Sequence, residues 1–227
     1  SYNYKELINK LVDDNQLVHI AGNLPQLPVV FEITKEDFDW AKRLNKTIKL
    51  LAQIDNSSDG FNARVYPVLV DTKHPLASIR GALNAVLVEG ENINQLVFSG
   101  PGAGAAPTAS AIIGDVLSAC HQMGSDQTNW YPLRKQKSGN KNVENVNSSW
   151  FIRLSVKDEP GVLATIAGLF GENSVSIESV IQEGRGDNAE LVLVTHEATE
   201  NNLNKSIESI KNLDSVSSVT STIRVYI

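Results

Sequence analysis

The sequence predicts a mixed α/β (α+β) chain, made of a mixed-sheet domain followed by a ferredoxin-like βαββαβ unit, and no Rossmann domain. Three observations lead to this prediction. The middle of the first half consists mostly of strand-like apolar runs, the second half alternates strand and helix patterns, and a polar stretch separates the two. We therefore place a first domain at residues 1–120, a linker at 121–149 and a second domain at 150–227.

Two helices are expected at the start of the first domain. Residues 4–12 carry an apolar stripe at helical spacing. For the second helix, Thr34 is the expected N-cap and Asp37 occupies the capping-box position. The apolar face of this second helix is formed by Phe38, Ala41 and Leu44.

Strands dominate the rest of the first domain. A short turn or helix, punctuated by Pro75 and Gly81, interrupts them. An alanine-rich helix follows a glycine-rich turn and closes the domain. The four expected strands are residues 48–54, 63–70, 84–90 and 94–100.

The glycine-rich turn, FSGPGAGAAPTAS at 98–110, raises the question of a nucleotide site. A dinucleotide fingerprint needs three glycines and a second parallel strand, but Pro107 holds the third position and the linker follows the helix. A P-loop fails because no Gly-Lys-Ser/Thr follows. Either the turn is only a tight strand-to-helix connection, or its backbone lets a negatively charged ligand approach the helix N-terminus.

The second domain has a pattern that can be followed almost without interruption. The turn at 158–161 connects its first strand to its first helix, whose apolar face comprises Val162, Ile166, Leu169 and Phe170. The order of elements is strand 151–156, helix 162–172, strands 175–182 and 189–196, helix 200–213 and strand 216–227. This order is that of a ferredoxin-like split βαβ unit.

The linker is inferred from composition. Residues 121–149 accumulate Asn, Ser, Lys and Gly and lose apolar periodicity. A linker of this length implies two units that can move relative to one another.

Composition also narrows the classes of function. A net charge of −6 with no run of Lys or Arg gives no footprint for nucleic acid or an anionic membrane. The chain has no apolar run long enough to span a bilayer, and the single cysteine, Cys120, favours a reducing compartment. We expect a cytoplasmic protein.

No catalytic constellation is evident in the sequence. The four histidines are isolated, and with one cysteine there is no metal-binding pattern. No Gly-x-Ser-x-Gly elbow is present. The adjacent carboxylates Asp158 and Glu159 are more typical of a favourable helix-dipole interaction than of acid–base catalysis. We predict no catalytic residue and no metal ligand.

Several motifs of the first domain resemble the catalytic region of homoserine dehydrogenase. They are HPLA at 74–77, NAV at 84–86 and GxGAGxxPTASA at 100–111, preceded by a matching segment at 33–54. The resemblance implies that Gly102, Gly104 and Thr108 face a nicotinamide cofactor, NAD(P), held by a nucleotide-binding domain that this chain lacks. Thr108 is also the natural N-cap of the following helix.

The same resemblance implies that the strands near 65–70 and 84–88 form a sheet used in dimerisation. The family's catalytic lysine and acidic residues find no match here, so no catalytic residue is transferred. The chain alone is therefore expected not to oxidise homoserine.

The second domain resembles an ACT domain, a small amino-acid-sensing module. The resemblance implies an effector, threonine by family expectation, at the turn formed by Asp158, Glu159, Pro160 and Gly161, and a homodimer or larger homo-oligomer. Gly161 would permit close approach of backbone, and the helix N-terminus would bind a carboxylate. Two alternatives remain open: a stand-alone amino-acid-binding regulator without enzymatic activity, and an excised or internally deleted version of an active enzyme of threonine biosynthesis.

Overall fold

The computed structural model describes residues 33–57, 60–90, 92, 94–123, 146–186 and 189–226. The expected helix at 4–12 lies outside this part. The described helices are α2 (Lys35–Arg43), the 3-10 helix η1 (Pro75–Ser78), α3 (Ala105–Met123), α4 (Val162–Glu172) and α5 (Glu200–Lys211). The described strands are β1 (Lys46–Ser57), β2 (Gly60–Asp71), β3 (Leu83–Gly90), β4 (Asn94–Pro101), β5 (Asn147–Val156), β6 (Ile177–Glu183), β7 (Ala189–Thr195), β8 (Ala198–Thr199) and β9 (Val216–Val225).

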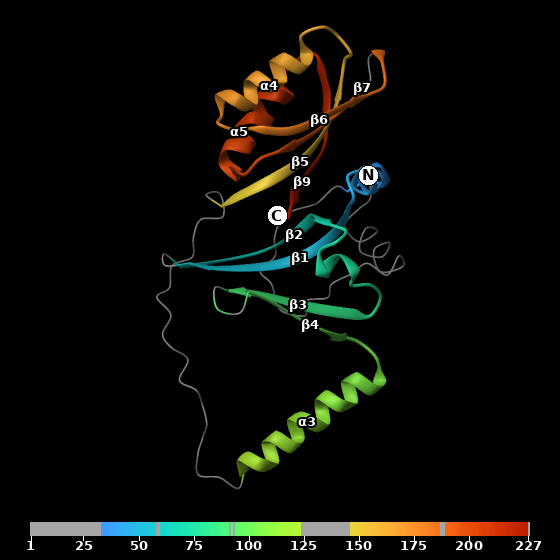
Figure 1. Ribbon diagram of the computed structural model, residues 1–227, viewed down its shortest axis with the longest axis vertical. Helices are drawn as coiled ribbons and strands as arrows, with labels where there is room; N and C mark the ends of the chain where they lie inside the picture. Colours follow the sequence, from blue (N-terminus) through green and yellow to red (C-terminus); the bar gives the residue numbers. More distant parts are fainter. Residues whose placement is uncertain are drawn as a thin grey trace.

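The main sheet crosses both halves of the chain (Figure 1). Its strands follow the order β1-β2-β9-β5-β7-β6, and β8 pairs with β5 beside this path. Strand β2 pairs with β9 in parallel, with Val68 opposite Arg224 and Leu69 opposite Val225, whereas the other pairs are antiparallel. The sheet is therefore mixed, as predicted, but the hydrogen bonds that join its two halves were not anticipated from the sequence.

The βαββαβ order of the second half is confirmed. Helices α4 and α5 lie on one face of the sheet (Figure 1) and bury a core that includes Ile152, Leu154, Ile166, Phe170 and Ile210. The predicted apolar face of α4 is buried apart from Leu169, which is half-buried. The two-residue strand β8 was missed, because an element so short has no periodicity to detect.

Helix α2 covers the opposite face of this sheet. Trp40 and Ala41 pack with residues of β5, β7 and β9, which are the buried side chains Phe151, Val192, Val194, Ile223 and Val225. The expected capping box is present, with the Thr34 N–H donating to Asp37 Oδ2 at 2.7 Å. Phe38 and Leu44 are only partly buried in this cluster. A helix from the first half thus completes the packing of the second half.

Strands β3 and β4 form a separate two-stranded sheet, and α3 extends away from it (Figure 1). We call β3, β4 and α3 the arm. The inner face of β3 packs through Ala85 and Leu87 against a small core around β2 and η1. The hairpin and α3 leave large apolar side chains exposed, namely Leu83, Val86, Val88, Leu96, Val97, Phe98, Ile112, Ile113, Val116, Leu117 and Met123.

The linker expected at 121–149 is shortened at both ends by regular structure. Residues 121–123 continue helix α3, and residues 147–149 already belong to β5. Residues 124–145 lie outside the described part. The domain boundaries therefore remain a prediction.

Candidate functional site

The glycine-rich turn lies at the exposed junction of β4 and α3. The Gly102 N–H donates to the carbonyl of Ala82 at 2.9 Å, which fixes the turn to the start of β3. A Cβ placed on Gly102 would lie 1.5 Å from Nδ2 of Asn84. A side chain at this position would have to displace the Asn84 amide, which gives glycine a structural reason that is independent of any cofactor.

Gly104 has a different requirement for glycine. Its φ of +126° lies in a region that L side chains rarely adopt. Helix α3 begins at the next residue, so the prediction that Thr108 is the N-cap is wrong. Thr108 lies one turn inside the helix, where its N–H donates to the Gly104 carbonyl at 3.2 Å. The misplacement arose because Pro107, which has no N–H, fits inside the first turn.

The turn between β5 and α4 collects the four predicted effector residues on the surface. Asp158, Glu159 and Pro160 are exposed. The Asp158 N–H donates to the Gly186 carbonyl at 2.8 Å, and Gln182 donates to Asp158 Oδ1 at 2.8 Å. These bonds hold the turn against the end of β6 and the β6–β7 connection. The bond from Gln182 orients the Asp158 carboxylate at the surface and uses only one of its two oxygens.

Gly161 is the N-cap of α4 and has a φ of +93°. A Cβ added at Gly161 would meet no atom within 4 Å beyond its immediate neighbours, so the glycine is required by backbone conformation rather than by space. The predicted open backbone at this helix N-terminus is therefore present. Geometry does not by itself assign a ligand to it.

A buried polar network, which sequence reasoning missed, joins α2 to β5 and β7. Arg153 donates from Nε to Asp37 at 2.9 Å, from one terminal nitrogen to Glu190 at 2.7 Å and from the other to Thr34 Oγ1 at 2.8 Å. Trp40 Nε1 donates to the second oxygen of Glu190 at 2.7 Å. Asp37 is fully buried, so its charge depends on Arg153. We call these five residues the clamp.

The electrostatics of the clamp favour its charged form. Burial lowers the pKa of Arg153, but the hydrogen bond to Glu190 and the charge of Asp37 outweigh burial and raise that pKa above its ordinary value. A charged residue within the apolar pattern FIRLSV was the available signal in the sequence. It marks the β5 face that α2 covers.

A second polar group lies where β2 meets β9. The Arg224 guanidinium carbon stands 4.4 Å from the ring centre of Tyr66 and 4.4 Å from that of Trp150. Arg224 also donates to Glu200 at 2.6 Å. Cation–π contacts of this kind stabilise a partly desolvated guanidinium. The sequence pattern gave no indication that these four residues converge.

We searched the described residues for a metal cluster and for a membrane-spanning helix. These residues contain no group of three or more His, Cys, Asp or Glu side chains placed to hold a metal ion. None of the described helices combines the length and apolar character needed to cross a bilayer.

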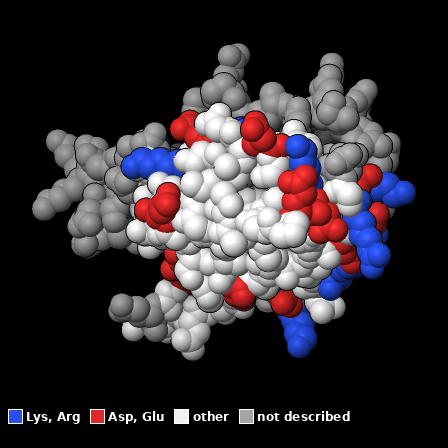
Figure 2. Space-filling model, turned by 90° about the horizontal axis from the view of Figure 1, so that it is seen from above, with Lys and Arg blue, Asp and Glu red and all other residues white. Residues whose placement is uncertain are grey.

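One face of the molecule has acidic side chains around a largely uncharged centre, with Lys and Arg gathered mostly toward one side (Figure 2). That face presents no continuous basic surface for nucleic acid.

The fold and these sites define a class of protein. A mixed-sheet region presents an exposed glycine turn at the start of a helix, and a ferredoxin-like βαββαβ unit is joined to it through one sheet. The chain therefore belongs to the class of two-part α+β proteins whose second part is ferredoxin-like.

Comparison with known proteins identifies both parts. Residues 7–117 match the family model of homoserine dehydrogenase, and residues 150–215 match that of the ACT domain. The chain thus consists of a homoserine dehydrogenase family region followed by an ACT domain, which confirms both resemblances.

Relatives and solved structures agree with this assignment. The homoserine dehydrogenase of Mycobacterium leprae is 38% identical over 212 residues, covering 86% of this chain and 47% of the relative. That of Bacillus subtilis is 32% identical over 200 residues, with 86% and 46% covered. The crystal structure of the homoserine dehydrogenase from Thiobacillus denitrificans superposes with a TM-score of 0.79 at 31% identity, covering 86% of this chain and 46% of that one. The chain spans about half the length of these relatives.

Proposed function

We propose that this chain supplies the dimerisation surface, the cofactor-facing wall and the amino-acid-sensing part of a homoserine dehydrogenase in aspartate-family amino-acid biosynthesis. The observation that carries the proposal is the arm. Most described residues of its glycine turn and of helix α3 are exposed, Gly100 and Pro107 being half-buried, although α3 has an apolar stripe at Ile112, Ile113, Val116 and Leu117. An apolar surface of this kind is typical of a docking site for another part of a protein.

In this proposal the glycine turn contacts a nicotinamide cofactor, NAD(P), bound to a nucleotide-binding region that docks on the arm. Gly102 and Gly104 have no side chain, so the cofactor can approach their backbone closely. Thr108 is exposed one turn further along α3, where its hydroxyl could donate a hydrogen bond. Because Pro107 has no N–H, only the first two helical residues and Gly104 offer free amides at this N-terminus.

The outer face of the β3–β4 hairpin is the proposed dimer surface. Val86 lies opposite Phe98 and Val88 opposite Leu96, so four exposed apolar side chains form one patch. Residues 65–70 were also expected to take part in dimerisation, but their position in the structure does not favour this role. Strand β2 is paired on both edges, and residues 66–70 are buried within this chain. We therefore assign self-association to the hairpin alone.

The proposed effector is an amino acid, threonine by family expectation, at the β5–α4 turn. Asp158 would accept a hydrogen bond from its ammonium group. The N-terminal amides of α4 beyond Gly161 would bind its carboxylate. A cytoplasmic location remains a prediction that rests on the single cysteine, Cys120.

Fusing the chain to the amino-terminal half of the Thiobacillus denitrificans relative tests the proposal. We expect the fused protein to oxidise homoserine with NAD(P), and the 227-residue chain alone to show no turnover. Gly104→Val should reduce turnover in the fusion, because it forces a side chain into a strained turn. Gly168→Ala, an exposed position inside α4, is the matched control that should leave turnover unchanged. Turnover by the isolated chain would contradict the proposal.

The alternative is a stand-alone amino-acid-binding regulator. It is favoured by the ACT domain, whose core is complete within the described residues. This alternative predicts amino-acid binding by the isolated chain and no gain of activity on fusion. A flat calorimetric titration of the folded chain with a panel of amino acids would count against it.

A further inference from the structure

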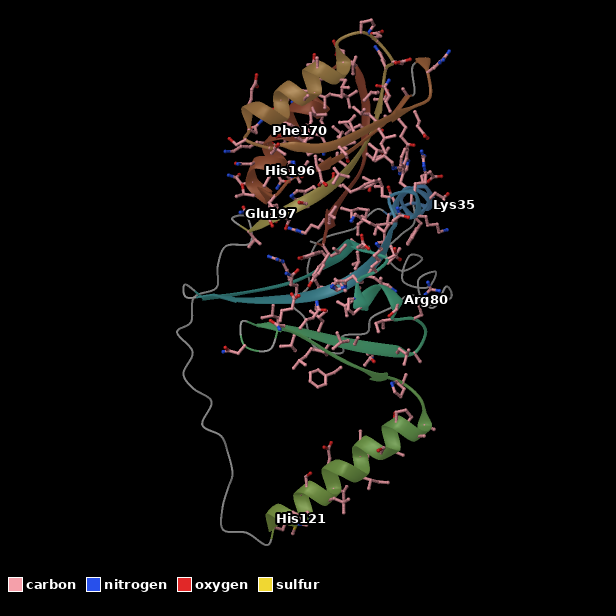
Figure 3. The ribbon with its side chains drawn as sticks, in the orientation of Figure 1. Lys35, Arg80, His121, Phe170, His196 and Glu197 are labelled. Carbon is pink, nitrogen blue, oxygen red and sulfur yellow. The ribbon has the colours of Figure 1, made fainter. Side chains whose placement is uncertain are left out.

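A polar pocket lies at the seam between the two halves of the chain, where β2 meets β9. Its volume is about 160 Å³. Its walls come from β1, β2, β3, the start of β5, the end of β9 and the residues after β7. The charged side chains that line it are Arg64, Glu89, Glu197 and Arg224. Glu197 lies at the end of the βαββαβ unit that faces β1 and β2 (Figure 3).

Two guanidinium groups converge on one wall of this pocket. The guanidinium carbons of Arg64 and Arg224 lie 5.4 and 4.4 Å from the ring centre of Tyr66. Arg64 Nε donates to the Tyr66 hydroxyl at 2.7 Å, and that hydroxyl donates to Gln53 at 2.6 Å. This chain of bonds fixes the position of Arg64.

The two positive charges interact unfavourably. Burial lowers the pKa of Arg224, Glu200 partly offsets this effect, and the nearby Arg64 adds to the lowering. The Arg224 side chain is only 12% exposed, and its buried Nε has no hydrogen-bond partner in the part of the chain that the structure describes. An anionic group placed in the pocket would stabilise the Arg224 guanidinium, because that side chain is largely shielded from water.

Two carboxylates line the same pocket. Glu89 comes from β3, where it accepts a hydrogen bond from Gln95 at 3.1 Å and a longer one from the Tyr226 hydroxyl at 3.4 Å. Glu197 is exposed and follows β7. A ligand with one charge of each sign would satisfy both sets of groups, whereas a simple anion such as phosphate would be repelled by the carboxylates.

We propose that the seam pocket binds a small free α-amino acid, with its carboxylate directed at Arg64 and Arg224 and its ammonium group at Glu89 and Glu197. This site is separate from the proposed effector turn at Asp158, and it does not depend on dehydrogenase activity. A ligand here contacts strands of both halves, because β2 and β3 belong to the first and β9 to the second. Its binding would therefore strengthen the junction between them.

Calorimetric titration of the 227-residue chain tests the proposal. The probes are glycine, L-serine and L-threonine, with acetate and methylammonium as the separate halves of the ligand. We expect saturable binding of at least one amino acid, and binding at least about tenfold weaker for either half alone, since each half makes only one set of charged contacts.

Matched variants locate the site. Arg64→Gln and Glu197→Gln should each weaken the seam binding by at least about tenfold, while Asp158→Asn leaves it unchanged. Glu197 is exposed, so its variant remains informative if Arg64→Gln does not fold, which circular dichroism will show. Loss of one binding event in the seam variants and of a second in Asp158→Asn supports both sites.

The contrary outcomes distinguish the two proposals. Binding that Asp158→Asn abolishes and that both seam variants retain would overturn the seam pocket and support the effector turn. Binding that only the seam variants abolish would support the pocket and remove the effector turn. No binding of any probe to the folded chain would contradict both.

Discussion

The clamp and the arm differ in the kind of side chain that they bury and the kind that they expose. The clamp buries charged groups, and every bond of the Arg153 guanidinium described above ends on a side chain of the same chain. The arm exposes apolar groups, including Phe98 at 62% and Ile113 at 59%. Buried charges are costly unless paired, and exposed apolar stripes are unfavourable unless covered.

The difference shows where the chain is complete and where it needs another surface. At the clamp, the cost of desolvating Asp37 is offset within the chain by Arg153 and by the Thr34 N–H. At the arm, nothing among the described residues covers the stripe on α3. Changes at the clamp should therefore alter stability, and changes at the arm should alter association.

The largest effect is expected for Arg153→Met. This change leaves the fully buried Asp37 without its cation, which costs about 3–5 kcal/mol of unfolding free energy. Chemical denaturation measures the loss. Arg185→Met, at an exposed position in the β6–β7 connection, is the control and should be close to neutral. Equal stability of the two variants would show that the clamp does not hold α2 to the sheet.

A smaller effect is expected for Gly161→Ala. The left-handed backbone at the N-cap of α4 disfavours any L side chain by about 1–2 kcal/mol. Thermal unfolding should show this loss, while Gly168→Ala, inside the same helix, is neutral or slightly stabilising. A loss of similar size at both glycines would mean that the helix, rather than the turn, determines the result.

The arm provides the contrast in stability. The double change Ile113→Gln and Val116→Gln should alter the unfolding free energy by no more than about 0.5 kcal/mol per site, because both side chains are more than half exposed. Binding of a hydrophobic dye should decrease clearly. A large loss of stability would show that α3 packs against the rest of this chain in solution.

The smallest effect is expected for Arg43→Gln. Arg43 pairs with Glu183 across the α2–β6 contact, but both side chains are about half exposed, so water screens the pair. The hydrogen bond to Glu183 raises the pKa of Arg43. We expect no measurable change in thermal stability at physiological salt. A clear loss of thermal stability would show that the Arg43–Glu183 pair also helps to hold α2 on the sheet.

Local patterns predicted much of the fold. The alternation in FIRLSV and the helical stripe of α4 placed the βαββαβ elements, and Thr34 with Asp37 marked the start of α2, because these signals depend on neighbouring residues. The β2–β9 pairing could not be predicted in this way. It joins residues more than 150 positions apart through backbone bonds that leave no trace in composition.

The same contrast between local and long-range signals applies to the sites. Gly104 and Gly161 were singled out from short local motifs, and both have a positive φ in the structure, a conformation that favours glycine. The roles of Arg153 and Arg224 depend on partners contributed by distant segments, Asp37 for the first and Tyr66 for the second. Only tertiary structure brings such groups together.

Hydrogen exchange of the 227-residue chain, alone and fused to the amino-terminal half of the Thiobacillus denitrificans relative, tests the central claim most directly. In the isolated chain we expect fast exchange of α3 amides and slow exchange of β5 and β7 amides, because the stripe on α3 is uncovered and the clamp is packed. Fusion should slow the exchange of α3 and leave β5 and β7 unchanged. Slow exchange of α3 in the isolated chain, or no slowing on fusion, would contradict the claim that the arm is a docking surface.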